Sequence, residues 1–335
     1  MAWSGNSGRK FTRGCLGSLL GLAALATVAM APQMAQAQYP EKPITGIAPF
    51  GVGGGTDIFA RVAAQYMSQV LGQPIVVVNK IGAAGNLGIK HVVEAPADGY
   101  TLLLNGPTMP QNPAFFRNLG YDPITSVIPV SQFVDYAQIV GVNSNNLPAK
   151  TLREAIELIR KNPGKYNAVS SGPTMLLNLY QFMLQNDLKM EIIPYNSAGE
   201  AMASLMKGEA DFVISEWSSM SPAILANKIR VLAVTDKERT PVLPDVPTSA
   251  EAGFPELLQG GYYGLYVRSG TPPEIVKKLY DAAQKVLDMP EVQERMKALN
   301  WRIRKRTTEE FTEIYRRDVA LWKDVVKKSK LPLLD

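Results

Sequence analysis

An α/β fold arranged in two lobes is the fold class that this sequence predicts. Short runs rich in β-branched or aromatic residues alternate with segments of helical periodicity. The 335 residues also exceed the size of a single typical hydrophobic core, and no tandem repeat or low-complexity segment interrupts the alternation. The expected strands cover residues 43–48, 75–79, 101–104, 138–142, 166–169, 191–193, 212–214, 231–234 and 263–267.

The first 37 residues have the pattern of a secretory signal peptide. Arg9, Lys10 and Arg13 precede an apolar run over 16–30, and Ala35-Gln36-Ala37 is a small-x-small cleavage site. A membrane anchor is the competing interpretation, but the run is short for a bilayer span and contains glycine and polar residues. We therefore expect export and cleavage after Ala37.

The cysteine content and net charge of the chain after residue 37 limit the functions that we expect of it. The only cysteine, Cys15, lies in the leader, so cleavage removes the thiol. The leader also holds three of the 35 basic residues and none of the 30 acidic ones, which leaves a net charge of +2. This charge does not favour nucleic-acid binding, and the basic run 302–306 is interpreted as a solvated strand edge. We expect no nucleic-acid partner, no metal and no cofactor.

The turn over residues 48–57 is the most informative local feature. It follows the strand over 43–48, and apolar residues from Ile58 onward then recur with helical spacing. Glycines at 51, 53, 54 and 55 allow a ligand to approach the backbone closely, and the helix N-terminus behind them offers unpaired N–H groups. The turn therefore predicts a binding site for a carboxylate or phosphate.

Nucleotide-binding interpretations of this turn fit poorly. A P-loop requires Lys after its last glycine, whereas Thr56 follows Gly55. The third glycine of a dinucleotide fingerprint would fall at Thr56, and Asp57 would repel a pyrophosphate. A small carboxylate fits better. The structural alternative is a tight strand-to-helix turn in which Thr56 or Asp57 is the N-cap.

Later helices carry recognisable start signals. The capping-box pattern of Thr and, three residues later, Glu occurs at Thr151, Thr271 and Thr307. A further helix is expected over 200–207, after a polar turn.

Short motifs in a fixed order extend over essentially the whole exported chain. Together they resemble the periplasmic receptors of tripartite tricarboxylate transporters, the Bug or TctC family. The motifs include Tyr39-Pro-Glu-Lys-Pro-Ile44, Pro49-Phe50, Gly54-Gly55-Thr56-Asp57, Asn79-Lys80, Gly82-Ala-Ala-Gly85, Ala97-Asp-Gly-Tyr-Thr-Leu-Leu103, Tyr121-Asp-Pro123, Pro194-Tyr195, Leu232-Ala-Val-Thr235 and Pro244-Asp-Val-Pro-Thr248.

The resemblance implies a two-lobe, hinge-bending periplasmic binding protein fold, type II-like, in which each lobe is a parallel-rich sheet flanked by helices. With chain crossings near Val142 and Leu265, the first lobe would combine 38–142 with 265–335. The second lobe would be 143–264. The ligand would lie in the cleft between the lobes.

The resemblance also implies three binding loops, at 50–57, 170–174 and 194–199. In this chain Asn196 replaces the family's usual lysine, and the 170–174 turn is shorter, with Leu176 near the usual histidine position. The expected ligand-binding residues are Phe50, Gly51, Gly53, Gly54, Gly55, Thr56, Asp57, Asn105, Thr108, Ser170, Ser171, Gly172, Thr174, Tyr195, Asn196, Ser197, Ala198, Gly199 and Glu216.

These departures remove positive or protonatable groups, so a ligand less charged than citrate is expected. Glu216 follows the strand over 212–214 and either receives an ammonium or hydroxyl group of the ligand or is a surface-exposed carboxylate. Candidates for an apolar pocket around one carboxylate, each with core packing as its alternative, are Phe59, Met109, Leu176, Trp217 and Tyr262.

Enzyme signatures are weak. His91 is the only histidine, no Gly-x-Ser-x-Gly elbow occurs, and no His/Cys group has metal-ligand spacing. A periplasmic lyase or hydrolase that uses Asp57 and Glu216 remains a minor alternative. The prediction is a monomeric, non-enzymatic periplasmic receptor that delivers a small organic carboxylate to a membrane transporter. The alternative in the same class is a receptor that signals to a sensor kinase.

Overall fold

The computed structural model describes residue 8, residues 39–257 and residues 260–329. The chain divides into two units, Met1–Tyr39 and Pro40–Asp335, and the fold below is that of the second unit. The predicted signal peptide lies outside the described residues except for Gly8. Among the described residues, no helix is both long enough and apolar enough to cross a bilayer.

The first part of this unit alternates strands and helices, as the sequence predicts. Strand β1 lies between β2 and β3 and runs parallel to both. Each strand leads into a helix, so the helix N-termini lie at the carboxyl ends of the strands. In order, the elements are β1 (Ile44–Ala48), α1 (Gly55–Leu71), β2 (Ile75–Asn79), the 3-10 turn η1 (Ala83–Gly85), α2 (Asn86–Glu94), β3 (Thr101–Asn105) and α3 (Thr108–Phe115).

Two long strands continue the sheet. Strand β9 (Gly260–Arg268) pairs antiparallel with β3 and with β4 (Val127–Val142). Along β4 the partner changes: residues 127–137 pair with β9, and residues 138–142 pair with β7 and β8. One strand therefore belongs to the hydrogen-bonding network of both parts of the sheet.

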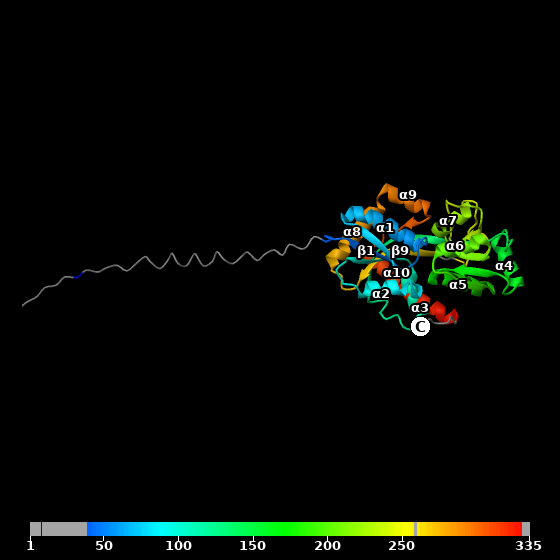
Figure 1. Cartoon of the computed structure of the whole chain (residues 1–335), viewed down its shortest axis with the longest axis horizontal. Coiled ribbons are helices and arrows are strands. Elements are labelled where there is room, and N and C mark those ends of the chain that lie inside the picture. The colour runs from blue at the N-terminus through cyan, green and yellow to red at the C-terminus, as the bar shows by residue number, and fades with distance from the viewer. Residues whose placement is uncertain (1–7, 9–38, 258–259, 330–335) are drawn as a thin grey trace, which may run out of the picture. The chain divides into compact units, whose positions relative to one another are not determined.

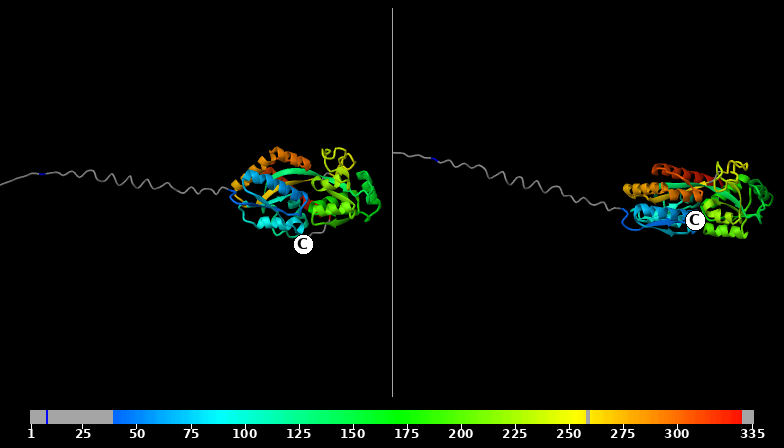
Figure 2. Two further views of the ribbon diagram at one scale, coloured as in Figure 1. Left: turned by 45° about the horizontal axis from the view of Figure 1, so that its top comes forward. Right: turned by 90° about the horizontal axis from the view of Figure 1, so that it is seen from above.

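The second part repeats the alternation. Its strands extend the sheet in the order β4-β7-β5-β6, with β8 also paired to β4. The helices of this part, drawn in green and yellow-green, gather at one end of the unit in Figures 1 and 2. The elements are α4 (Leu152–Lys161), β5 (Asn167–Ser170), α5 (Pro173–Asn186), β6 (Glu191–Pro194), α6 (Ala198–Lys207), β7 (Phe212–Glu216), α7 (Trp217–Leu225) and β8 (Arg230–Val234).

The C-terminal elements return to the first part. Helix α8 contacts α1, and α10 contacts α3, so segments far apart in the sequence lie side by side (Figure 1). Strand β10 pairs with the edge of β4, where Arg302 and Arg304 donate to the Asp135 carboxylate. These elements are α8 (Pro273–Leu287), α9 (Pro290–Ala298), β10 (Arg302–Ile303) and α10 (Thr308–Ser329).

Most of the expected elements are confirmed, with shifted ends. The expected strand over 138–142 is only the last third of β4, because the sequence before it mixes polar and apolar residues that are nevertheless mostly buried. Capping boxes are present at Thr151 and Thr307, whose hydroxyls accept from Glu154 N–H at 3.1 Å and Glu310 N–H at 3.2 Å. The capping box predicted at Thr271 is absent, so that prediction is wrong.

At that third position the helix starts one residue later than a capping box requires. The N-cap of α8 is Pro272, which has no side-chain cap, and the Thr271 hydroxyl donates instead to the Arg268 carbonyl at 2.7 Å. The expected division into lobes at Val142 and Leu265 stays a prediction. The change of pairing partner within β4, between Ala137 and Gln138, lies a few residues before the first expected crossing.

Candidate ligand-binding site

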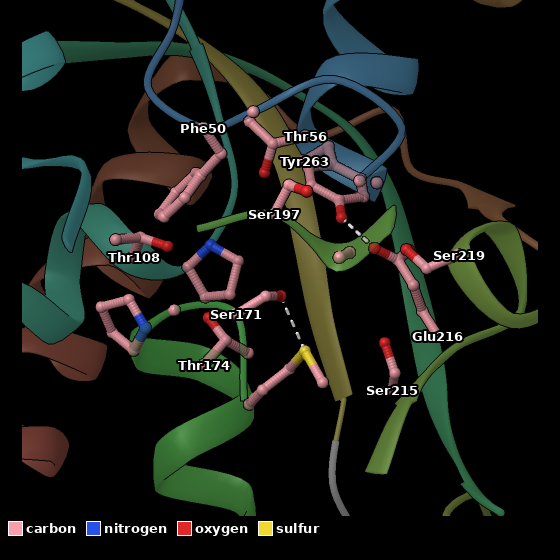
Figure 3. A pocket seen from close by; sticks show the side chains of 18 of the residues that line it. Phe50, Thr56, Thr108, Ser171, Thr174, Ser197, Ser215, Glu216, Ser219 and Tyr263 are labelled. Carbon is pink, nitrogen blue, oxygen red and sulfur yellow. Dashed lines mark hydrogen bonds between the residues drawn. The ribbon is translucent and has the colours of Figure 1, made fainter. Parts of the chain in front are cut away.

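A cavity that is partly open to solvent lies where several helix N-termini face the junction of β4, β7 and β9 (Figure 3). The first turns of α1, α3, α5, α6 and α7 all contribute lining residues. Helix N-termini carry partial positive charge and free N–H groups, so their convergence favours an anion. The lining residues are Phe50, Gly51, Gly54, Gly55, Thr56, Pro107, Thr108, Tyr136, Gln138, Ser171, Gly172, Pro173, Thr174, Met175, Ser197, Ala198, Ser215, Glu216, Ser219 and Tyr263.

The first loop presents its backbone to this cavity. Gly54, not Thr56 or Asp57, is the N-cap of α1, and it has no side-chain cap, so the structural alternative for this turn is wrong in its choice of N-cap. Of the three adjacent glycines at 53–55 only Gly53 has a left-handed backbone, with φ of +86°. A Cβ on Gly55 would lie 1.7 Å from Glu216 Oε1. A glycine is therefore needed at position 55 because a larger side chain would overlap Glu216, and not because of its backbone φ angle.

Asp57 holds this loop in place through hydrogen bonds and is not among the residues that line the cavity. Its carboxylate is 2% exposed and accepts from Gly53 N–H at 3.2 Å and from the Asn79 amide at 2.9 Å. Arg61 forms an ion pair with it at 2.9 Å. Burial alone would raise the pKa of Asp57, but the bonds from Arg61, Asn79 and Gly53 bring that pKa below its usual value.

The second loop faces the first. Ser197 caps α6, accepting from Glu200 N–H at 3.2 Å, and the Glu200 carboxylate accepts from Asn196 N–H at 3.2 Å. A Cβ on Gly51 would lie 2.9 Å from Ser197 Cβ, and one on Gly54 would lie 3.5 Å from Ala198 Cβ. The two loops are thus in contact across the cavity mouth.

The third loop forms another wall. Gly172, with φ of +154°, is the N-cap of α5, and its Cα lies against the Phe50 ring, since a Cβ there would be 3.1 Å from it. The Ser171 hydroxyl donates to Met175 Sδ at 3.0 Å (Figure 3). The Thr174 hydroxyl donates to Gln111 Oε1 at 2.7 Å.

Glu216 ends β7 on the opposite wall, where it is 7% exposed. The Tyr263 hydroxyl and the Trp301 indole N–H, the latter at 3.1 Å, donate to its two oxygens. Tyr263 itself stacks between Phe59 and Tyr136, with ring centroids 5.1 and 4.9 Å apart. Burial raises the pKa of Glu216. The alternative of a surface-exposed carboxylate is wrong.

The structure brings many of the expected residues together. Those that line the cavity are Phe50, Gly51, Gly54, Gly55, Thr56, Thr108, Ser171, Gly172, Thr174, Ser197, Ala198 and Glu216. Those that do not are Gly53, Asp57, Asn105, Ser170, Tyr195, Asn196 and Gly199. Ligand contact by any of them stays a prediction.

Sequence reasoning missed several lining residues. Tyr136 and Gln138 belong to the long strand that the sequence only partly predicts, and Ser215 directly precedes Glu216. The alternation of strand side chains could have drawn attention to Gln138 once its partner strand was known. The missed residues are Pro107, Tyr136, Gln138, Pro173, Met175, Ser215, Ser219 and Tyr263.

The five apolar candidates are not among the residues that line this cavity, and the packing of most of them agrees with the core-packing alternative. Phe59, Met109 and Tyr262 are buried in the core of the first part, and the Trp217 indole donates to the Ala298 carbonyl at 3.0 Å. Leu176 packs with residues of α3 and α10. Each sits on a helix or strand face that turns toward neighbouring elements, which local sequence does not reveal.

Charge is sparse in the cavity. No Lys, Arg or His lines it within the described part of the chain, and Glu216 is its one charged lining residue there. Residues 39–257 and 260–329 hold no group of three His, Cys, Asp or Glu side chains placed to bind a metal. A concave cavity lined by polar backbone groups and hydroxyls is typical of proteins that bind small molecules.

Comparison with known proteins identifies the family. Residues 59–331 match the model of the tripartite tricarboxylate transporter family receptor, TctC. A UPF0065 protein from the TAR-I ttuE-ttuC' intergenic region of Agrobacterium vitis is 34% identical over 282 residues, which cover 83% of this chain and 81% of the relative. The chain belongs to the TctC family of periplasmic solute-binding receptors.

Solved structures agree with this assignment. A periplasmic transporter structure is 40% identical, with a TM-score of 0.84 and coverage of 88% of this chain and 100% of the other. The R. palustris protein Rpa4515 with adipate is 27% identical, with TM-score 0.84 and coverage of 88% and 100%. MatC from Rhodopseudomonas palustris with bound malate is 28% identical, with TM-score 0.82 and coverage of 86% and 100%.

These findings confirm the expected periplasmic binding protein fold and the expected non-enzymatic class. The minor alternative of a lyase or hydrolase that uses Asp57 and Glu216 is overturned, because the family is one of receptors. The geometry agrees, since the Asp57 carboxylate is held by Arg61 and Asn79.

Proposed function

We propose that this receptor captures a small organic carboxylate in the described cavity and delivers it to the membrane subunits of a tripartite tricarboxylate-type transporter. It acts as a monomer, after export and cleavage behind Ala37. The carboxylates named for two related structures, adipate and malate, support the ligand class. Mass measurement of the protein isolated from the periplasm tests the cleavage, since a first residue other than Gln38 would contradict it.

The observation that carries the proposal is the convergence of five helix N-termini on a cavity whose lining, among the residues that the structure describes, includes no Lys, Arg or His. A helix N-terminus stabilises an anion by about 0.3 to 1 kcal/mol when exposed and up to ~2 kcal/mol when partly buried. Micromolar affinity requires about 8 kcal/mol. Hydrogen bonds to hydroxyls such as those of Thr56 and Ser171, together with contacts to Phe50 and Met175, must supply the remainder.

The lack of a basic lining residue also limits the ligand's charge. A second or third buried carboxylate would have no cation to pair with and would lie in the same cavity as Glu216. A monocarboxylate, or an aromatic acid with a single buried carboxylate, should therefore bind more tightly than citrate.

A thermal-shift screen of mono-, di- and tricarboxylates, followed by competition titration at neutral pH, tests this. A ligand at about 100 times its dissociation constant stabilises the protein by about 2.7 kcal/mol, which is readily measured. Tighter binding of citrate than of every monocarboxylate and aromatic acid would refute the charge argument. The absence of binding by any carboxylate would refute the proposed function itself.

A further inference from the structure

The cavity has two chemically different sides. Helices α1, α5 and α6 present N-terminal N–H groups and hydroxyls, whereas β4 and β7 present acceptors. On the strand side, Gln138 and Glu216 are directly paired residues of the antiparallel β4–β7 ladder, and both line the cavity. Paired residues on adjacent strands carry their side chains on the same face, so the two acceptors form one local site.

Gln138 holds an acceptor that the protein does not use. Its side chain is 2% exposed, and its Oε1 has no hydrogen-bond partner among the described residues. By contrast, its backbone N–H donates to the Thr235 hydroxyl at 3.0 Å. A buried acceptor without a partner costs about 1 to 3 kcal/mol. A donor on the ligand would remove that cost.

Burial raises the pKa of Glu216, but the hydrogen-bond donors around its carboxyl group oppose that shift and favour the ionised form. Both of its oxygens receive a donor, from Tyr263 and Trp301, and a further lone pair on each oxygen is still available. Figure 3 shows the carboxylate directed toward the Tyr263 hydroxyl at the side of the pocket. Gly55, the first residue of α1, lies against it, so the positive end of that helix favours the ionised form. The titratable groups packed around it are the phenols of Tyr136 and Tyr263, and neither supplies a positive charge.

We propose that Gln138 and Glu216 form a subsite for an ammonium group, so that the ligand is a small amino carboxylate. This inference rests on the proposed function and specifies its ligand class. The ligand carboxylate faces the helix N-termini, and the ammonium donates to Glu216 and to Gln138 Oε1. An ammonium supplies three donors and a full positive charge, whereas a hydroxyl supplies one donor and no charge to offset the buried carboxylate.

Titration calorimetry with matched ligands tests the subsite. Each set contains three ligands: an amino carboxylate, the same acid without the amino group, and the acid with a hydroxyl in place of the amino group. The sets cover chains of two to six carbons, with the substituent at the α or the terminal carbon. In at least one set we expect the amino carboxylate to bind at least about tenfold more tightly than both partners, as for a hydrogen bond between charged groups. In Glu216→Gln this preference, taken as the ratio of the two dissociation constants in the same variant, should fall to about twofold or less.

Two further variants sharpen the test. Gln138→Met keeps the length of the side chain without the acceptor and should lose part of the amino preference, which also provides a readout if Glu216→Gln does not fold. Glu94→Gln neutralises a largely exposed carboxylate on α2 and should retain the full preference. Thermal unfolding confirms that each variant is folded.

Two results would overturn the subsite. One is that the unsubstituted or hydroxy acid equals the amino carboxylate in every set, and the other is that the amino preference survives both Glu216→Gln and Gln138→Met. In either case continued binding of unsubstituted acids would leave the proposed carboxylate receptor intact. If no carboxylate of any kind binds, both proposals fail.

Discussion

At the residue scale, adjacent glycines in one loop have different roles. Gly55 is packed against the buried Glu216–Tyr263 pair, whereas a Cβ on Gly54 would meet its nearest neighbour, Ala198 Cβ, at an ordinary contact distance of 3.5 Å. Asp57, two residues beyond Gly55, holds the loop through its hydrogen bonds and is not a lining residue of the cavity. These distinctions depend on contacts between residues far apart in the sequence.

The first residue-scale prediction compares the same substitution at both glycines. Gly55→Ser should lower the free energy of unfolding by about 1 to 3 kcal/mol, because the new Cβ would overlap Glu216 and Tyr263. Gly54→Ser should change it by less than about 0.5 kcal/mol, since serine is a good N-cap. Urea unfolding measures both. Equal losses for the two variants would contradict the packing argument.

A second residue-scale prediction concerns pH. The native pKa of Asp57 is held below its usual value of 3.8, so the native state gains stability wherever the carboxylate is ionised. At pH 7 the Asp57→Asn variant should be less stable than the wild type by about 1 kcal/mol, a value reduced by the solvent exposure of Arg61. This difference should persist above pH 4 and disappear as the pH falls through the lower native pKa.

Urea unfolding at a series of pH values from 7 down to 2.5 tests this prediction. Glu94→Gln serves as the control, because Glu94 and Lys90 form a loose, exposed pair at 3.7 Å. Its stability should follow that of the wild type at every pH. A constant difference between Asp57→Asn and the wild type down to the lowest pH would show that the carboxylate charge does not matter.

At the element scale, the cavity depends on where helices begin. Helix α6 begins behind Ser197, whose hydroxyl accepts from Glu200 N–H, and α4 begins in the same way behind Thr151. Only the first of these two caps lines the cavity. Comparing substitutions at Ser197 and Thr151 therefore distinguishes the effect of a lost helix cap on stability from its effect on ligand binding.

We expect Ser197→Ala and Thr151→Ala each to lower the free energy of unfolding by about 1 kcal/mol. Ser197→Ala should also weaken carboxylate binding by about 3- to 10-fold, through loss of one hydrogen bond at the cavity, whereas Thr151→Ala should not. Calorimetric titration with the tightest carboxylate of the screen measures this. Unchanged binding in Ser197→Ala would remove that hydroxyl from the site.

At the scale of the whole molecule, the loops at 50–57 and 194–199 contact each other and narrow the mouth of the cavity. Gly51 lies beside Ser197, and Gly199 lies near the Val52 carbonyl, which would be 3.7 Å from an added Cβ. Because these loops come from the two parts of the sheet, we expect them to separate when a ligand enters.

The corresponding prediction is a contraction of the receptor on ligand binding, measured by small-angle scattering. The double variant Ser197→Ala with Gly199→Val should remain compact without ligand but fail to contract, because it loses the Ser197 hydroxyl and adds two methyl groups beyond a Cβ that would already be in ordinary contact with the Val52 carbonyl at 3.7 Å. Thr151→Ala should contract as the wild type does. Normal contraction in the double variant would mean that other residues hold the closed state.

The sequence by itself determined the α/β class, most strand positions, the strand-to-helix turns and the family. These follow from local periodicity, glycine and capping patterns, and the order of short motifs. Only the tertiary structure decided which side chains face the cavity. The Asp57 carboxylate pairs with Arg61 and Asn79. The Tyr263 hydroxyl, on a strand far along the chain, donates to Glu216. Burial and pairing at such positions depend on contacts between distant segments, which local sequence patterns do not encode.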